Sequence, residues 1–180
     1  MAYIGAGVEY GLHCLLFLVG RTADEAAPSS RDLAELQGVP AEYAAKLFTK
    51  LQKAGIVCTT EGARGGLRLG RDPGSISVHD VVIAIDGAAP LFDCREIRSR
   101  CAVLTDDKPA WATQGLCGIH RLMRQAEEQM REVLRGVSLA DLATSFGRKT
   151  SPDFHDQIAA WLDGRARTRG HRGKPEGVNP

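Results

Sequence analysis

The sequence predicts a mainly α-helical protein with one small β-hairpin, and three observations lead to this fold class. Apolar residues recur with a helical period in several segments. Two short strand-like runs, 56–60 and 67–69, flank a glycine-rich stretch. Apolar residues make up 43% and charged residues 25% of the 180 residues, which is typical of one globular domain with an extension.

The first predicted helix covers residues 8–19 and is mostly apolar. Its polar interruptions, Glu9 and His13, stand four residues apart and therefore share one helix face. Cys14 follows directly, beside leucines and Phe17, and is expected to be a small buried apolar residue.

The next two helices are short and joined by a tight turn. Ser30 is expected to cap a helix over 31–37, and Gly38-Val39-Pro40 ends it. Pro40 suits the start of a second helix over 41–54, which stops at Gly55. Two short helices around a turn that contains glycine form a helix-turn-helix.

The strand-like runs follow the helix-turn-helix at once. Residues 61–66, Glu-Gly-Ala-Arg-Gly-Gly, form the tip of the hairpin between them, and Cys58 in the first run is expected to be buried. A helix over 78–85, capped by Ser77, comes next. This order predicts a winged helix-turn-helix, a mainly α fold with a small β-wing.

A winged helix of this kind binds double-stranded DNA. Its recognition helix lies in the major groove, and basic residues or the wing contact phosphates or the minor groove. The net charge of only +1 means that such an interface depends on a local basic stripe. The alternative is that the lysines of 41–54 are merely the solvated side of an amphipathic helix. The candidates for DNA contact are Glu42, Tyr43, Lys46, Thr49 and Lys50 in the helix and Arg64 at the wing tip.

The second half of the chain has less regular patterning. Residues 88–115 show no sustained period, and a loop of that length is usually functional or disordered. A long amphipathic helix over 117–134 follows, and its apolar stripe predicts packing against a second copy of the chain. Beyond it we expect a capped turn at 138–143, a marginal helix at 154–162 and a disordered Gly/Arg/Pro-rich tail from Gly164 on.

Four parts are therefore expected along the chain. They are a winged-helix DNA-binding domain at 1–87, a cluster-binding loop at 88–116, a dimerisation helix with a C-terminal turn at 117–143, and a partly disordered tail at 144–180.

The five cysteines need an explanation. The longest apolar run, 15–19, is far shorter than the roughly 20 residues of a membrane helix, so we expect a cytoplasmic protein without membrane contact. Disulfides are rare in the cytoplasm. Metal binding, redox sensing and burial are the remaining roles for these thiols.

Several of these segments together resemble one family, the IscR/NsrR/RsrR family of dimeric winged-helix regulators. The resemblance covers about residues 1–143 and implies homodimers that bind near-palindromic promoter sites, many of them sensing through an iron–sulfur cluster. Many IscR-like proteins carry arginine where this chain has Glu61, which places more weight on Arg64. The similar segments are 32–36, Tyr43, 46–48, 51–57, 62–66 and 81–87.

The resemblance also implies two ligand sets. The chain is similar to the RsrR branch at 7–10, 12–14 and 94–98, where a Glu and a His of the first helix join two cysteines on a 2Fe–2S cluster. Thiolates are the usual cluster ligands, and imidazole or carboxylate replaces some of them. The matching residues are Glu9, His13, Cys94 and Cys117. The second set, nearer to the IscR pattern, is Cys94, Cys101, Cys117 and His120.

The sequence therefore favours a homodimeric transcription regulator, a repressor, that senses redox state or nitric oxide through a 2Fe–2S cluster. A cluster-free thiol sensor of the same fold is the main alternative. A redox or metal-handling enzyme is less favoured, because Gly5-x-Gly7 lacks the third glycine of a dinucleotide fingerprint and no nucleophile–base pair is visible. A protein-binding module that uses the wing is the third alternative.

Overall fold

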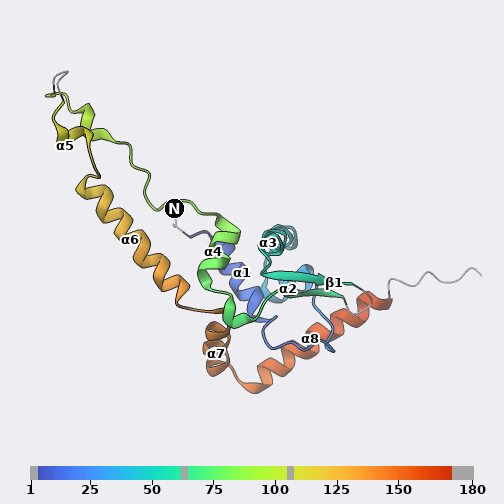
Figure 1. Cartoon of the computed structure of the whole chain (residues 1–180). Helices are drawn as coiled ribbons and strands as arrows, with labels where there is room; N and C mark the ends of the chain where they lie inside the picture. The colour runs from blue at the N-terminus through green and yellow to red at the C-terminus, as the bar shows by residue number, and fades with distance from the viewer. Residues whose placement is uncertain (1–3, 62–64, 105–107, 172–180) are drawn as a thin grey trace, which may run out of the picture. The chain divides into compact units, whose positions relative to one another are not determined.

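The computed structural model describes residues 4–61, 65–104 and 108–171, and divides the chain into two compact units. Unit 1 contains residues 1–87 and 134–180, and unit 2 contains residues 88–133. Figure 1 shows the helices and strands in chain order from blue to red.

Three helices begin unit 1. Helix α1 spans Ala6–Leu16, α2 spans Ser30–Gln37 and α3 spans Ala41–Lys53. The N-cap of α2 is Ser29 rather than the expected Ser30: its hydroxyl accepts a hydrogen bond from the Asp32 N–H while the Asp32 carboxylate accepts one from the Ser29 N–H. Gly38 ends α2 in the left-handed conformation with φ 66°, as a helix C-cap requires.

The wing is a two-stranded antiparallel hairpin of β1 (Val57–Thr60) and β2 (Gly66–Leu69). Val57 pairs with Leu69 and Thr60 with Gly66. A Cβ atom on Gly66 would lie 2.3 Å from the Ala27 carbonyl oxygen, so only glycine allows the wing to pack this closely on the loop before α2. The expected tip residues 62–64, including Arg64, lie outside the described residues.

The expectation that Cys58 is buried is wrong. Of the four β1 residues only Val57 is buried, because only one face of the short hairpin meets the core. The Cys58 thiol instead donates a weak hydrogen bond to the Leu69 carbonyl at 3.7 Å. Cys14, by contrast, is 2% exposed, as expected.

A short 3-10 turn, η1 (Pro73–Ser75), leads to α4 (Val78–Asp86), which Ser77 caps as predicted. The chain returns to this point after unit 2: the Val78 N–H donates to the Val137 carbonyl at 2.9 Å, and the Leu139 N–H donates to the Ile76 carbonyl at 2.8 Å. Helix α7 (Leu139–Lys149), capped by Ser138, is therefore joined to the start of α4.

The core of unit 1 lies between α1, α2, α3, the wing and α4. Burial of such apolar side chains is the main favourable term in folding. The fully buried side chains include Leu15, Leu33, Leu51, Ile56, Ile76, Val81 and Leu139.

Two C-terminal expectations need correction. The turn at 138–143 is part of the longer helix α7, and the segment from Gly164 on is not disordered up to His171, because α8 covers Pro152–His171. Its inner side, Leu162 and Ala166, is buried. Arg165 and Arg169 form ion pairs with Asp32 of α2, so tertiary contacts stabilise a helix that its composition does not favour.

Unit 2 contains more local structure than the sequence predicts. A 3-10 turn, η2 (Ile97–Arg100), and a short helix, α5 (Ala110–Thr113), interrupt the long loop. Helix α6 (Gly118–Arg135), most of which belongs to this unit, follows. Within the described residues, no helix combines the length and apolar character that crossing a membrane requires.

Candidate functional site

The helix-turn-helix of unit 1 presents one side of α3 to solvent. Ala44, Leu47, Phe48 and Leu51 are buried against the core, as the apolar stripe predicted. The opposite side is exposed and carries the five helix residues expected to contact DNA, which are Glu42, Tyr43, Lys46, Thr49 and Lys50.

Four of these residues differ in how their side chains are engaged. The Lys50 ammonium donates to the Ile85 carbonyl at 2.5 Å, at the C-terminal end of α4, and the Thr49 hydroxyl donates to the Ala45 carbonyl at 2.9 Å. The Tyr43 ring meets the Tyr10 ring edge-on at 6.0 Å. Lys46 is exposed, and its ammonium meets no partner within the described ranges. Lys46 is therefore the residue of this group that is most available to a phosphate or a base.

Glu9 and His13 both lie on the exposed side of α1. They line an apolar groove of about 660 Å³ in unit 1, whose walls include Val8, Leu12 and Phe146. The expectation that the two side chains share one helix face is thus confirmed, and both are accessible from outside the domain.

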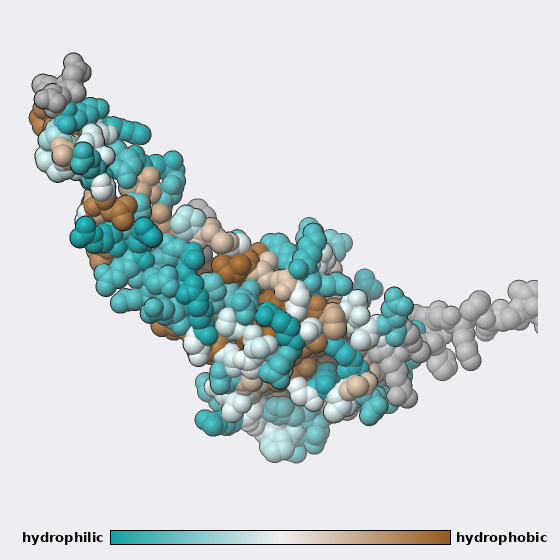
Figure 2. All heavy atoms as spheres, viewed as in Figure 1, coloured by the Kyte–Doolittle hydropathy of each residue, from teal (hydrophilic) through white to brown (hydrophobic). Residues whose placement is uncertain are grey.

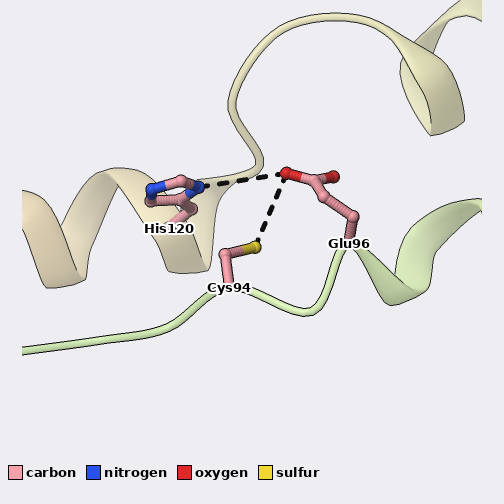
Figure 3. A group of neighbouring side chains, drawn as sticks. All are labelled: Cys94, Glu96 and His120. Atoms are coloured by element: carbon pink, nitrogen blue, oxygen red, sulfur yellow. Dashed lines mark hydrogen bonds and ion pairs between the residues drawn. The ribbon is translucent and has the colours of Figure 1, made fainter. Parts of the chain in front are cut away.

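The second group of candidate ligands lies in unit 2. The Cys94 thiol is 3.5 Å from Oε1 of Glu96, and the same oxygen is 4.0 Å from Nδ1 of His120. Figure 3 shows the three side chains converging from the loop around residues 94–96 and the first turn of α6. One ligand atom from each residue lies within 4.8 Å of the other two. A thiolate, a carboxylate and an imidazole at this separation are suited to binding a transition metal.

Cys117 lies directly before α6, beside this group. Its Sγ accepts a hydrogen bond from the His120 backbone N–H at 3.3 Å. The ring of Phe92 meets the His120 ring edge-on at 6.1 Å. The structure therefore gathers Cys94, Cys117 and His120 in one unit, together with Glu96, which the sequence reasoning did not select.

Glu96 has an unusual backbone. Its φ of 47° and ψ of 47° make it the one non-glycine residue with positive φ among those the structure describes. This conformation is unfavourable for a residue with a Cβ, so contacts of the surrounding structure must hold it in place. The Cys94-x-Glu96 spacing was the available sequence signal, but spacing alone does not show that a loop residue turns inward.

Arg98 holds Glu96 and the loop before Cys117. Its guanidinium donates to the carbonyls of Trp111 at 2.9 Å, Gln114 at 3.3 Å and Gly115 at 2.7 Å, and forms an ion pair with Glu96 at 3.1 Å. Hydrogen bonds from Arg98 and then from the Cys94 thiol lower the pKa of Glu96 below its ordinary value. The carboxylate is therefore ionised at neutral pH, as a metal ligand must be.

The imidazole of His120 also fits a metal-binding role. Its Nδ1 is buried and has no hydrogen-bond partner among the described residues. A buried polar atom without a partner is costly, and a bound ion would satisfy it.

The other cysteines lie apart from this group. Cys101 is exposed and does not belong to it, although the second ligand set included it. Desolvation raises the pKa of the Cys14 thiol to about 11, so this buried thiol is unreactive. Glu9 and His13 belong to unit 1 while Cys94 and Cys117 belong to unit 2, so the first ligand set stays a prediction.

Comparison with known proteins adds three findings. A family model described as Rrf2, iron-dependent transcriptional regulator, matches residues 4–145. Similar curated proteins include the HTH-type transcriptional regulator IscR of Vibrio parahaemolyticus, which is 32% identical over 113 residues. That alignment covers 63% of this chain and 61% of the relative, less than two thirds of the relative's length.

Two solved structures share the fold. T. potens IscR has a TM-score of 0.62 at 23% identity, covering 83% of this chain and 92% of the other. CymR, the global cysteine regulator of B. subtilis, has a TM-score of 0.59 at 23% identity, covering 81% of this chain and 98% of the other.

Proposed function

Since this chain belongs to the Rrf2 family of iron-dependent transcriptional regulators, we propose that it is a homodimeric DNA-binding repressor that senses redox state or nitric oxide through a 2Fe–2S cluster. The observation that carries the proposal is the exposed face of α3 in a winged helix-turn-helix, with the ammonium of Lys46 unpaired within the described part of the chain. The expected place of action is the cytoplasm, where promoter DNA is found.

The homodimer is supported by α6. None of its residues is buried, although it carries an apolar stripe. Ile119 is 65% exposed, Leu122 62% and Val133 69%. Figure 2 shows brown, hydrophobic surface between teal residues along α6. Covering this stripe with the same stripe of a second copy would remove apolar surface from water.

The cluster is supported by the thiols of unit 2 and by the polar pair on α1. We propose that Cys94 and Cys117 bind it together with Glu9 and His13. When bound, the group supplies one-electron redox chemistry and reactivity toward nitric oxide. The role of the chain is to supply thiolate, carboxylate and imidazole donors, and mixed ligation of this kind shifts the reduction potential.

The DNA interface is tested with the dimer and a promoter duplex. Lys46→Ala is expected to weaken binding by about 5- to 150-fold. If Lys46 contacts a phosphate, the variant also reduces the slope of log Kobs against log [salt] by about 0.9 per lost contact. Arg148→Ala, which removes an exposed charge from α7, is the matched control and is expected to bind as the unaltered protein does. Equal affinities of the Lys46 and Arg148 variants would contradict this interface.

The ligand set is tested by visible absorption after anaerobic preparation. Replacing Glu9, His13, Cys94 or Cys117 by alanine is expected to change or abolish the cluster spectrum, whereas Cys101→Ala leaves it unchanged. A spectrum that survives loss of Glu9 and His13 but not loss of Cys101 would favour the second set, Cys94, Cys101, Cys117 and His120.

A cluster-free thiol sensor is the second candidate, because Cys58 and Cys101 are exposed free thiols. It predicts a colourless protein whose DNA affinity changes with peroxide and returns with a thiol reductant. The family match and the named relatives are transcriptional regulators, which disfavours the enzyme alternative.

A further inference from the structure

We propose that Cys94, Glu96 and His120 bind a single transition-metal ion, such as Fe²⁺ or Zn²⁺, within one copy of the chain. This site needs neither α1 nor a second copy. It goes beyond the proposed cluster, which takes two ligands on each of two irons and shares only Cys94 with this site.

The separations of the three donor atoms fit one ion. Zn–S bonds of about 2.3 Å and Zn–N or Zn–O bonds of about 2.0 Å place tetrahedral ligand atoms about 3.3–3.5 Å apart. The Cys94 Sγ to Glu96 Oε1 distance is 3.5 Å, which meets this requirement without movement. The Glu96 Oε1 to His120 Nδ1 distance is 4.0 Å, and all three ligand atoms lie within 4.8 Å of one another. Binding of one ion therefore requires His120 to move toward the other two ligands by roughly an ångström.

The orientation of the Glu96 carboxylate is set before an ion arrives. The left-handed backbone of Glu96 turns its carboxylate toward Cys94 and His120. Arg98 holds the other carboxylate oxygen, Oε2, at 3.1 Å, so Oε1 is left to face the thiol and the imidazole. A ligand that hydrogen-bonds to a second residue keeps its orientation, and such supporting contacts raise metal affinity.

His120 supplies the observation that points most directly to a ligand. Its Nδ1 faces Glu96 but is buried without a hydrogen-bond partner among the described residues, while the edge of Phe92 packs on the ring. An imidazole nitrogen is a common ligand of Fe²⁺, Co²⁺ and Zn²⁺. The thiolate favours these ions over Mg²⁺ or Ca²⁺, which prefer oxygen ligands.

The Cys94 thiol is common to the two proposed sites. Cys94 belongs both to this site and to the proposed cluster ligands, so the ion and the cluster exclude each other. A protein molecule that lacks the cluster would bind a single ion instead. Water would occupy the fourth position of the tetrahedral coordination around that ion.

The site is tested on the full chain in its cluster-free form by titration with Co²⁺ alone. We expect one ion per chain, with the thiolate-to-cobalt charge-transfer absorption that a Cys–Co²⁺ bond gives, and displacement by Zn²⁺. Cys94→Ala should abolish this absorption. Glu96→Gln and His120→Ala should each weaken Co²⁺ binding by more than about 10-fold, because loss of a direct ligand costs at least as much as loss of a supporting contact.

Two controls separate this site from the others. Cys101→Ala removes an exposed thiol outside the group, and His13→Ala removes a proposed cluster ligand; both should bind Co²⁺ as the unaltered chain does. Far-ultraviolet circular dichroism shows that each variant is folded. Unchanged binding by the Glu96 and His120 variants, or loss of binding in either control, would overturn the proposal. The cluster spectrum and DNA affinity are separate readouts, so failure of this site is distinguishable from failure of the proposed function.

Discussion

The cysteines differ in exposure, which predicts that they differ in reactivity. Cys14 is 2% exposed and its thiol faces the Leu33 carbonyl at 3.9 Å, whereas Cys58 and Cys101 are exposed. Only a thiolate attacks an alkylating reagent, so burial and a raised pKa protect Cys14 in two ways.

Alkylation is expected to separate these thiols. Because the pKa of Cys14 is about 11, brief iodoacetamide treatment of the folded protein near pH 8 should label Cys58 and Cys101 and leave Cys14 unlabelled. Mass spectrometry of the digested protein measures this directly. Cys14 should react only after the chain is unfolded, and labelling of Cys14 at the rate of Cys101 would refute the assignment.

Arg98 stabilises the backbone of a neighbouring loop segment. Its hydrogen bonds to three carbonyls hold the segment before Cys117. Hydrogen bonds from a charged donor are each worth about 1.5–3 kcal/mol, so Arg98→Ala should increase the rate of amide hydrogen exchange in residues 110–116 by at least about 10-fold.

Two variants make this test specific. Arg98→Lys should not restore protection, because an ammonium lacks the planar fork that reaches several acceptors. Arg95→Ala removes a neighbouring arginine, 76% exposed and paired with Asp93, and should leave exchange unchanged. Equal exchange in the alanine variants of Arg95 and Arg98 would show that Arg98 does not hold this segment.

At the scale of elements, α7 depends on its N-terminal cap. The Asp141 carboxylate accepts hydrogen bonds from the Ser138 hydroxyl at 2.6 Å and from its N–H at 2.9 Å. These bonds lower the pKa of Asp141 below its ordinary value of 3.8. The ionised carboxylate therefore stabilises the folded state above the unfolded-state pKa, and this contribution is lost as the pH falls through the folded-state pKa.

Asp141→Asn is accordingly expected to lower the free energy of unfolding at neutral pH. The difference from the unaltered protein should shrink as the pH falls from about 3.8 downward. Urea unfolding at a series of pH values measures it. Asp156→Asn removes an exposed charge from α8 and serves as the control. A difference that is the same at neutral and acidic pH would contradict the capping role.

Helix α8 lies beyond the residues that the family model matches, and ion pairs connect it to α2 of the helix-turn-helix. Asp32, 2% exposed, meets Arg165 at 3.4 Å and also Arg169, whose guanidinium donates to the Ala27 carbonyl at 2.8 Å. Asp163, which also lies on α8, forms an ion pair with Arg21 at 3.2 Å. A buried carboxylate requires such partners, since an unpaired one is strongly unfavourable.

Replacing both Arg165 and Arg169 by alanine should therefore destabilise unit 1 by about 1–3 kcal/mol, less than for a fully buried pair because both guanidiniums are partly exposed. Chemical denaturation measures the change. Arg167→Ala, exposed on the same helix, should have little effect. A double variant as stable as the Arg167 variant would show that these ion pairs do not stabilise unit 1.

At the scale of the whole molecule, the proposed dimer rests on the stripe of α6. Leu122→Glu places a charge at a position that the dimer would bury, so it should raise the dimer dissociation constant by about 100-fold or more. Sedimentation velocity measures the dissociation. Gln125→Glu adds the same charge off the stripe and should leave the dimer intact. A Leu122 variant that remains dimeric would place the interface elsewhere.

Much of the fold was predictable from residue patterns. The helical periods and caps of α2, α3 and α4 predicted these elements to within one or two residues, and the glycine-rich stretch before Leu67 predicted the wing. These features are local, since a helix period or a capping serine acts within a few residues. The burial of Cys58 was mispredicted because a two-stranded hairpin covers only one of its faces.

The sequence by itself determined the winged-helix order and the amphipathic character of α6, because these follow from local spacing. Only the tertiary structure decided that the Glu96 carboxylate meets His120 and that α8 extends to His171 against Asp32. Both depend on contacts between residues far apart in the chain: a left-handed turn held by Arg98 in one case and a buried carboxylate in need of cations in the other. No local pattern encodes such contacts, since they form only when the separate elements pack.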